Sequence, residues 1–167
     1  MNRTATYTTR RTRTGYRYSG SPKLVLAVQY ATTDAALPTR AQVRRWVRVA
    51  QEMDATVTIR FVGATEARAL NARFRGKDYA TNVLTFVYDV GSPRAGDIVL
   101  CAPIVGQEAA TQGKPLAAHY THLVVHGMLH LQGYDHERDA DAAAMEARET
   151  AILARLRLPD PYGVAAT

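Results

Sequence analysis

The eleven residues from His126 to His136 (HGMLHLQGYDH) constrain this chain more than any other segment. His126 and His130 lie four residues apart in an apolar run, so on a helix both side chains project from one face, one turn apart. Gly133 permits the left-handed backbone that ends a helix, and the reversed chain can then return His136 toward the same point. The spacing therefore predicts a metal centre with three imidazole ligands and a fourth position left to water.

The frame H-x-x-x-H-x-x-G-x-x-H has the ligand spacing of the metzincin proteases, but those proteases carry Glu after the first His, where this chain has Gly127. The general base of a protease is therefore missing. Zinc by itself lowers the pKa of a bound water to about 7, so hydrolysis stays possible. Peptide cleavage needs a positioned base, and a phosphodiester is therefore a better expected substrate than a peptide. The alternatives are ordinary core histidines or a structural zinc site. A structural site usually takes a fourth Cys or His, and the only cysteine, Cys101, lies far away in a predicted buried strand.

Other polar side chains near the motif are candidates for contacts to a ligand or to substrate. His119 and His122 fall on the helical face that carries His126 and His130. We expect His119 at the surface, whereas for His122 a contact to a ligand or substrate and a plain surface position are both open. Asp135 could orient a ligand imidazole, accept a proton, or serve only as a turn residue or helix cap.

Three sequence blocks together resemble a known family. HGMLHLQGYDH, with NARFRGKDYATNVLTF at 71–86 and GDIVLC at 96–101, is similar to the YbeY family of bacterial endoribonucleases, which are rRNA maturation and ribosome quality-control factors. The resemblance runs from about Leu24 to Tyr162. It implies a single-strand-specific endoribonuclease whose partners are rRNA and the ribosome or its small subunit.

The resemblance also assigns roles to particular residues. It implies that one zinc ion is held by His126, His130 and His136, and that the functionally important arginine is Arg75, in the segment FRGKD. A guanidinium has a permanent charge and a planar fork that matches phosphate oxygens, so Arg75 would stabilise charge that builds up on a reacting phosphate. Lys77 could add a second charge or be a solvated surface cation. The expected catalytic residues are therefore Arg75 and His126.

Composition limits the class of protein. The chain has 167 residues, of which 47% are hydrophobic, enough to bury one core. A single cysteine excludes an internal disulfide, and no apolar run approaches the roughly 18 residues that a membrane span needs. We therefore expect a cytoplasmic protein without a membrane partner. The oligomeric state is left open.

The formal net charge of +6 arises in the first 23 residues, which contain several arginines and no acidic residue. This start is rich in Thr, Arg and Tyr and poor in aliphatic residues, so we expect residues 1–22 to form a basic, disordered tail and residues 23–167 the nuclease domain. The tail could be an incidental extension, an arm that binds single-stranded RNA, or a targeting segment.

Hydrophobic periodicity predicts the elements of the fold. Strands are expected at 24–30, 55–62, 82–88 and 97–101. Helices are expected from a capping box at Thr39 to about Met53, from a cap at Thr65 to Arg75 with Ala67, Leu70 and Phe74 on one face, and at 102–112, 116–132 and 140–156. This order predicts a single α+β domain with a mixed sheet of about four strands packed with about five helices.

Three functions are consistent with these observations. The first is a zinc-dependent endoribonuclease, in which attack by water or by the 2′-hydroxyl of the substrate is open. The second is a ribosome-associated assembly or binding factor whose zinc is structural. The third is a metalloprotease, which Gly127 disfavours. Three histidines and a water would also suit nickel, cobalt or copper.

Overall fold

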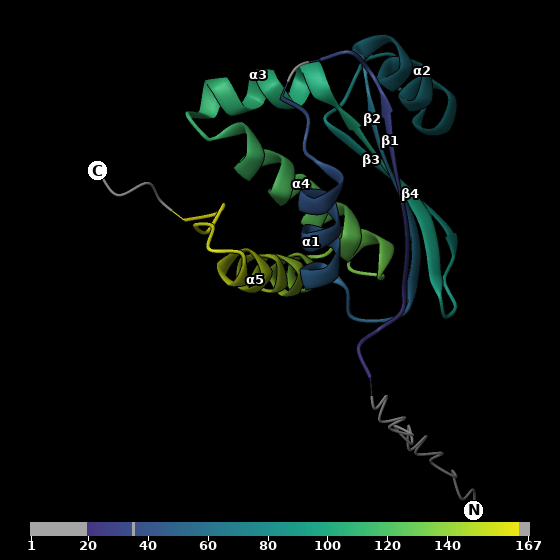
Figure 1. Cartoon of the computed structure of the whole chain (residues 1–167), viewed down its shortest axis with the longest axis vertical. Coiled ribbons are helices and arrows are strands. Elements are labelled where there is room, and N and C mark those ends of the chain that lie inside the picture. Colours follow the sequence, from purple (N-terminus) through teal and green to yellow (C-terminus); the bar gives the residue numbers. More distant parts are fainter. Residues whose placement is uncertain (1–19, 35, 164–167) are drawn as a thin grey trace, which may run out of the picture.

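The structure is a computed structural model, and it describes residues 20–34 and 36–163. Most of the basic segment 1–22 lies outside these ranges, so its disorder stays a prediction. Figure 1 shows a sheet with helices packed around it, and the strand and helix labels below follow that figure.

The sheet has four strands. They are β1 (Leu24–Ala31), β2 (Ala55–Val62), β3 (Val83–Asp89) and β4 (Arg94–Cys101). Their order in the sheet is β1-β2-β4-β3, with β1, β2 and β4 parallel and β3 antiparallel to β4. The predicted mixed four-stranded sheet is therefore confirmed, and β3 forms one of its edges.

The domain contains five helices, as the sequence predicted. They are α1 (Arg40–Ala50), α2 (Ala64–Arg75), α3 (Ala102–Gln112), α4 (Leu116–Leu131) and α5 (Asp139–Arg155). The helices α1, α4 and α5 lie together on one side of the sheet, whereas α2 lies at the upper end of the sheet in Figure 1. The architecture is a single α+β domain.

The main core lies between β2, β4 and the three helices on that side. Along β2, Val57, Ile59 and Phe61 are buried, and Thr58 and Arg60 between them point the other way, as the period of a strand requires. The helix α4 is buried on most of its circumference, which explains why its sequence is apolar almost all round. Burying each large apolar side chain stabilises the fold by about 1.5–3 kcal/mol, so α4 is held rigidly at the centre.

Two local predictions were wrong. The first helix ends at Ala50, before Met53, because Gln51 is extended and its side chain donates to the Met53 carbonyl. The second helix begins after Gly63, not at a Thr65 cap. Phe74, which periodicity placed on one face with Ala67 and Leu70, is 52% exposed.

Candidate metal centre and its cleft

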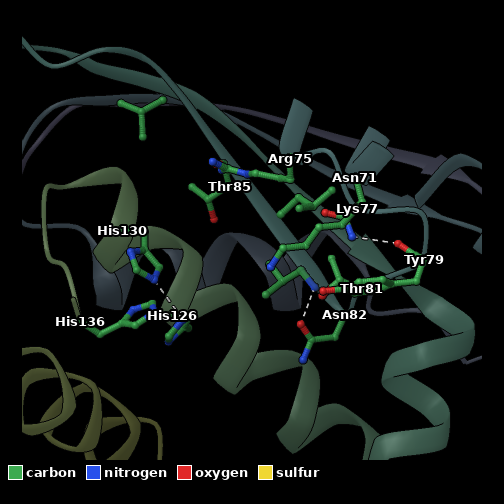
Figure 2. A pocket seen from close by; sticks show the side chains of 13 residues that line it. Asn71, Arg75, Lys77, Tyr79, Thr81, Asn82, Thr85, His126, His130 and His136 are labelled. Atoms are coloured by element: carbon green, nitrogen blue, oxygen red, sulfur yellow. Dashed lines mark hydrogen bonds between the residues drawn. The ribbon is translucent and has the colours of Figure 1, made fainter. Parts of the chain in front are cut away.

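The end of α4 is built to reverse the chain next to its own histidines. Gly133 has a φ of +96°, which a residue with a side chain rarely adopts. Its N–H donates to the His130 carbonyl, and the N–H of Tyr134 donates to the Leu129 carbonyl, so the last carbonyls of the helix are satisfied. The predicted glycine turn is thus confirmed, and the chain after it brings His136 back beside α4 (Figure 2).

The three motif histidines converge on one point. One ring nitrogen from each of His126, His130 and His136 lies within 4.8 Å of the others. The Nε2 atoms of His126 and His130 are 3.1 Å apart, and Figure 2 shows the three rings facing one another. This arrangement is compact enough for three ligands of one tetrahedral ion.

The tautomer of His130 is set by the turn. Its Nδ1 lies 3.1 Å from the carbonyl oxygen of Tyr134. A carbonyl only accepts, so Nδ1 carries the proton and Nε2 of the neutral ring presents its lone pair to His126 and His136. Burial, together with the charges of His126 and His136, lowers the pKa of His130, against a smaller opposing effect of the Tyr134 carbonyl. The neutral ring is the form that binds a metal, so these residues fit a zinc ion.

Tyr134 is itself fastened to two other elements. Its hydroxyl donates to the Glu52 carboxylate at 3.0 Å, and Arg148 of α5 pairs with the same carboxylate. Gln132, which is 5% exposed, donates to the Ala50 carbonyl at 3.0 Å and accepts from the backbone N–H of Glu52. The turn at Gly133 that follows α4 is therefore tied to the end of α1.

Arg75 lies on the opposite side of the cleft, at the end of α2. The helix ends there because Gly76 adopts a left-handed conformation with a φ of +69°. One Arg75 nitrogen, Nη2, donates to the carbonyl of Thr85 on β3 at 2.9 Å, and the guanidinium carbon lies 5.8 Å from the centre of the Phe86 ring. These contacts direct the side chain along the edge of the sheet while its other N–H groups remain for a ligand.

The loop after α2 is held by its own contacts. Asn71, which is 2% exposed, donates from Nδ2 to the Tyr79 carbonyl at 2.8 Å. On the outer side, Arg68 and Asp78 form a two-bond ion pair, with 2.7 Å between Nε and Oδ1. The loop is therefore fixed at its start and middle, so Lys77 extends from a defined backbone toward the cleft (Figure 2).

Between these two sides lies a cleft of about 630 Å³. Arg75, Lys77 and Thr85 line one side of it, and the three motif histidines line the other. Among the described residues that line it, none is Asp or Glu. The cleft combines a metal-ligand set with two cations and no carboxylate, which suits an anionic substrate.

A model of a known protein family matches most of the chain. The family model described as Endoribonuclease YbeY matches residues 28–157. The chain belongs to the YbeY endoribonuclease family.

The similar proteins cover most of the chain. Endoribonuclease YbeY of Thiobacillus denitrificans is 57% identical over 144 residues, which are 85% of this chain and 98% of that protein. Endoribonuclease YbeY of Aromatoleum aromaticum is 56% identical over 147 residues, covering 86% of this chain and 96% of the relative. The solution structure of TM1509 from Thermotoga maritima has a TM-score of 0.54 at 24% identity, covering 84% of this chain and all of that one, which supports the fold.

Two further histidines of α4 lie elsewhere than the sequence suggested. His119 is 4% exposed, and its Nε2 lies 2.8 Å from a Glu108 carboxylate oxygen, so the prediction that it lies at the surface was wrong. The side chain of His122 is 20% exposed, and its Nε2 lies 2.7 Å from Oε1 of Glu149. His122 is therefore not a plain surface residue, and a contact with a metal ligand or substrate stays a prediction.

Asp135 has the contacts of a turn residue. Its Oδ1 accepts from the backbone N–H groups of His136 at 2.7 Å and of Glu137 at 3.3 Å. Within the described part of the chain, no hydrogen bond joins this carboxylate to an imidazole. Asp135 therefore fixes the backbone that carries His136. This is the role of a turn residue, one of the alternatives that the sequence left open.

Glu149 and Tyr162 lie behind the motif histidines, and no local sequence pattern indicates either residue. Both are far from the motif along the chain, and only the packing of α5 on α4 brings them near.

No helix in the described part of the chain has both the length and the apolar character of a membrane span.

Proposed function

We propose that this chain is a metal-dependent endoribonuclease that cleaves single-stranded RNA. In this proposal it acts in the cytoplasm, in rRNA maturation and ribosome quality control, with the ribosome or its small subunit as partner. The observation that carries the proposal is the cleft itself, in which three imidazoles face Arg75 and Lys77 and no carboxylate of residues 20–34 and 36–163 lines the space between. The relatives named Endoribonuclease YbeY give the same class of reaction.

The histidines would hold one zinc ion, and nickel or another divalent metal would suit the same nitrogens. When bound, such an ion supplies a Lewis acid for a phosphate oxygen and lowers the pKa of a bound water. His126 and His130 come from a rigid helix, and His136 from a turn that Asp135 and Tyr134 hold. The chain thus fixes the ligand geometry before the metal arrives, which favours binding.

Arg75 would bind the phosphate on the other side of the cleft. One of its N–H groups is used by the Thr85 carbonyl, and the remaining donors, which form no hydrogen bond within the described part of the chain, can form two parallel bonds to non-bridging phosphate oxygens. Charge that builds up on these oxygens during cleavage strengthens such bonds, so they contribute to the rate as well as to binding. Lys77 would add a point charge for the same or the neighbouring phosphate.

The form of the cleft supports single-strand specificity. A volume of about 630 Å³ is in the range of sites that enclose one small ligand. A flexible single strand can insert one phosphate between the two sides, whereas a duplex holds its phosphates on a rigid outer surface. Exposed Tyr79, which also lines the cleft, offers a ring on which an unpaired base can stack.

The proposal is tested by measuring metal content and RNA cleavage together. Purified protein should contain about one equivalent of metal and cleave single-stranded RNA faster than duplex RNA, and a chelator should abolish both metal and cleavage. Undiminished cleavage by metal-free protein would contradict the proposal. The chemical ends of the products then decide the attacking group, since a cyclic 2′,3′-phosphate would exclude direct attack by water.

A second candidate function is a ribosome-associated assembly or binding factor whose zinc is structural. It is favoured by the large apolar side chains Phe74, Val87, Tyr88 and Val90, which are exposed at the end of α2, on β3 or directly after β3. A His130→Ala protein separates the two functions. A variant that folds but loses all cleavage counts against the structural role, whereas one that unfolds favours it.

A further inference from the structure

A fully buried carboxylate lies directly behind the metal site. Glu149 of α5 has no exposed surface, and it faces the side of α4 that carries His122 and His126. The Nδ1 atom of His126 lies 3.4 Å from Oε1 and 3.5 Å from Oε2 of Glu149. In the described part of the chain, no other hydrogen-bond acceptor contacts this nitrogen. His126 thus lies between Glu149 and the point where the three motif histidines meet.

The position of Glu149 is fixed by the segment after α5. The hydroxyl of Tyr162 donates to Oε2 of Glu149 at 2.6 Å. Tyr162 is held in turn because its N–H donates to Asp160, whose carboxylate also accepts from the hydroxyl of Thr150 on α5 at 3.2 Å. On the other side, His122 Nε2 lies 2.7 Å from Oε1, although their alignment is outside hydrogen-bond geometry. Both oxygens are therefore confined.

The contacts around Glu149 make its carboxylate a hydrogen-bond acceptor. The hydroxyl of Tyr162 donates to Oε2, and Nδ1 of His126 faces both oxygens. A carboxylate oxygen held in this way accepts from a ring nitrogen. The nitrogen of His126 that faces it must then carry a proton, and the neutral ring keeps its lone pair on Nε2.

That lone pair points where a metal ligand is needed. Nε2 of His126 is 3.1 Å from Nε2 of His130, whose own lone pair is set by the Tyr134 carbonyl. We propose that Glu149 is a positioning residue that acts through His126, fixing its tautomer and ring orientation and raising its affinity for the metal. This inference rests on the metal site of the proposed function, but not on RNA cleavage. A carboxylate that accepts from the second nitrogen of a ligand histidine typically contributes a factor of about 10–100 to metal affinity.

A second cation behind the site is the competing explanation. His122, His126 and Glu149 also each offer an atom within 4.8 Å of the others. A cation there would take the lone pair of His126 Nδ1 and remove its proton. The two explanations therefore differ in the number of metal ions bound and in the protonation of one nitrogen.

The test compares two glutamines on the same helix. Glu149→Gln keeps the shape and one acceptor oxygen but loses the charge, and Glu146→Gln removes an equal charge from an exposed residue beside His126 and His136. Zinc affinity is measured by competition with a chromophoric chelator, on protein whose unfolding is followed in parallel. We expect Glu149→Gln to bind zinc about 10-fold more weakly than wild type and Glu146→Gln to stay within about 3-fold. Equal affinities for the two folded variants would overturn the proposal.

A measurement on the unaltered protein avoids any folding defect. Long-range proton–nitrogen NMR of the wild-type protein with one equivalent of zinc should show a protonated Nδ1 on His126. An unprotonated Nδ1, or tight binding of two equivalents of zinc, would favour the second cation and overturn the positioning role. Failure of wild-type protein to bind zinc at all would instead refute the metal site of the proposed function, so the two failures are distinguishable.

Discussion

Gly127 of α4 lies so close to Ile98 of β4 that a Cβ atom built on it would be 2.8 Å from Cγ2 of Ile98. This residue lies between the candidate ligands His126 and His130, where the metzincin frame has its catalytic Glu. The side chain of a protease base would therefore meet the sheet and not the metal. The close approach of α4 to β4 thus gives a structural reason why this chain follows the ligand spacing of a protease without its base.

The first prediction concerns this contact. Gly127→Ala should lower the free energy of unfolding by about 1–2 kcal/mol, because overpacking against Ile98 outweighs the better helix propensity of Ala. Gly106 of α3 is the matched control, since a Cβ there meets nothing within 4 Å. Gly106→Ala should raise stability by up to about 1 kcal/mol. Urea unfolding of both variants measures the difference, and equal shifts would contradict the packing argument.

The second prediction concerns Gln132, whose side chain joins the end of α4 to the end of α1. Gln132→Ala leaves the Ala50 carbonyl and the N–H of Glu52 without their partner, and should destabilise the protein by about 1–3 kcal/mol. The exposed Gln112 at the end of α3 serves as control, and its change to Ala should have little effect. Chemical denaturation of the metal-free proteins tests this, and a Gln132→Ala variant as stable as the control would refute it.

The third prediction concerns Arg75. Arg75→Ala should reduce the rate of RNA cleavage by about 100-fold or more, because stabilisation of charge on the phosphate is lost. Metal content should not change, since Arg75 contacts Thr85 and Phe86 and none of the histidines.

Arg73 provides the comparison for Arg75. It lies in the same last turn of α2 but stacks on the Phe74 ring. It lines a second pocket beside the cleft that contains the motif histidines, and not that cleft itself. Arg73→Ala should therefore cleave at close to the wild-type rate. Single-turnover cleavage with saturating protein separates chemistry from binding, and similar losses in both variants would indicate a general electrostatic role.

Local physics explains which parts of the fold were predictable. The capping box of Thr39 and Gln42, the alternation of β2 and the glycine turn after α4 each depend on residues close in sequence, and each is present. The histidine spacing belongs to the same class, because a helix fixes the direction of side chains four residues apart. Predictions of this kind need no knowledge of tertiary packing.

The rest of the site depends on contacts between distant segments. Nothing in the local sequence around Thr85 indicates that its carbonyl orients Arg75, and Glu149 reads as an ordinary charged helix residue until α5 packs on α4. The exposure of Phe74 has a similar origin, because a helical period predicts one face of α2 but not how much of it the sheet covers. The strand order β1-β2-β4-β3 likewise follows from packing and not from any single segment.

The fourth prediction concerns the loss of one candidate metal ligand, His136, and the stability that zinc adds. His136 is exposed and lies in the turn, so His136→Ala should leave the stability of the metal-free protein unchanged while weakening zinc binding. Zinc at 100 times its Kd should stabilise the wild-type protein by about 2.7 kcal/mol, and the variant by much less at the same concentration. Thermal unfolding with and without zinc measures both quantities. An equal zinc-dependent rise in Tm for both proteins would exclude His136 as a ligand.

The fifth prediction is a pH dependence that arises from Cys101, the buried last residue of β4. Burial raises the pKa of its thiol above the ordinary value of 9.0, with a smaller addition from the charge of Asp34 and an opposing backbone hydrogen bond from Ile104. The unfolded chain therefore loses this proton first as the pH rises. The stabilisation that arises from this pKa difference is complete below pH 9, and it is lost as the pH rises through the pKa of the Cys101 thiol in the folded protein.

Cys101→Ala isolates this effect from the other groups that titrate in alkali. The variant should be less stable than wild type at pH 7.5, because it leaves a small cavity in the sheet. As the pH rises from 8 to 10 the wild-type protein alone loses the thiol contribution, so the difference in free energy of unfolding should shrink. Urea unfolding across this range measures the difference, and a constant gap would show that the thiol ionises equally in the folded and unfolded chains.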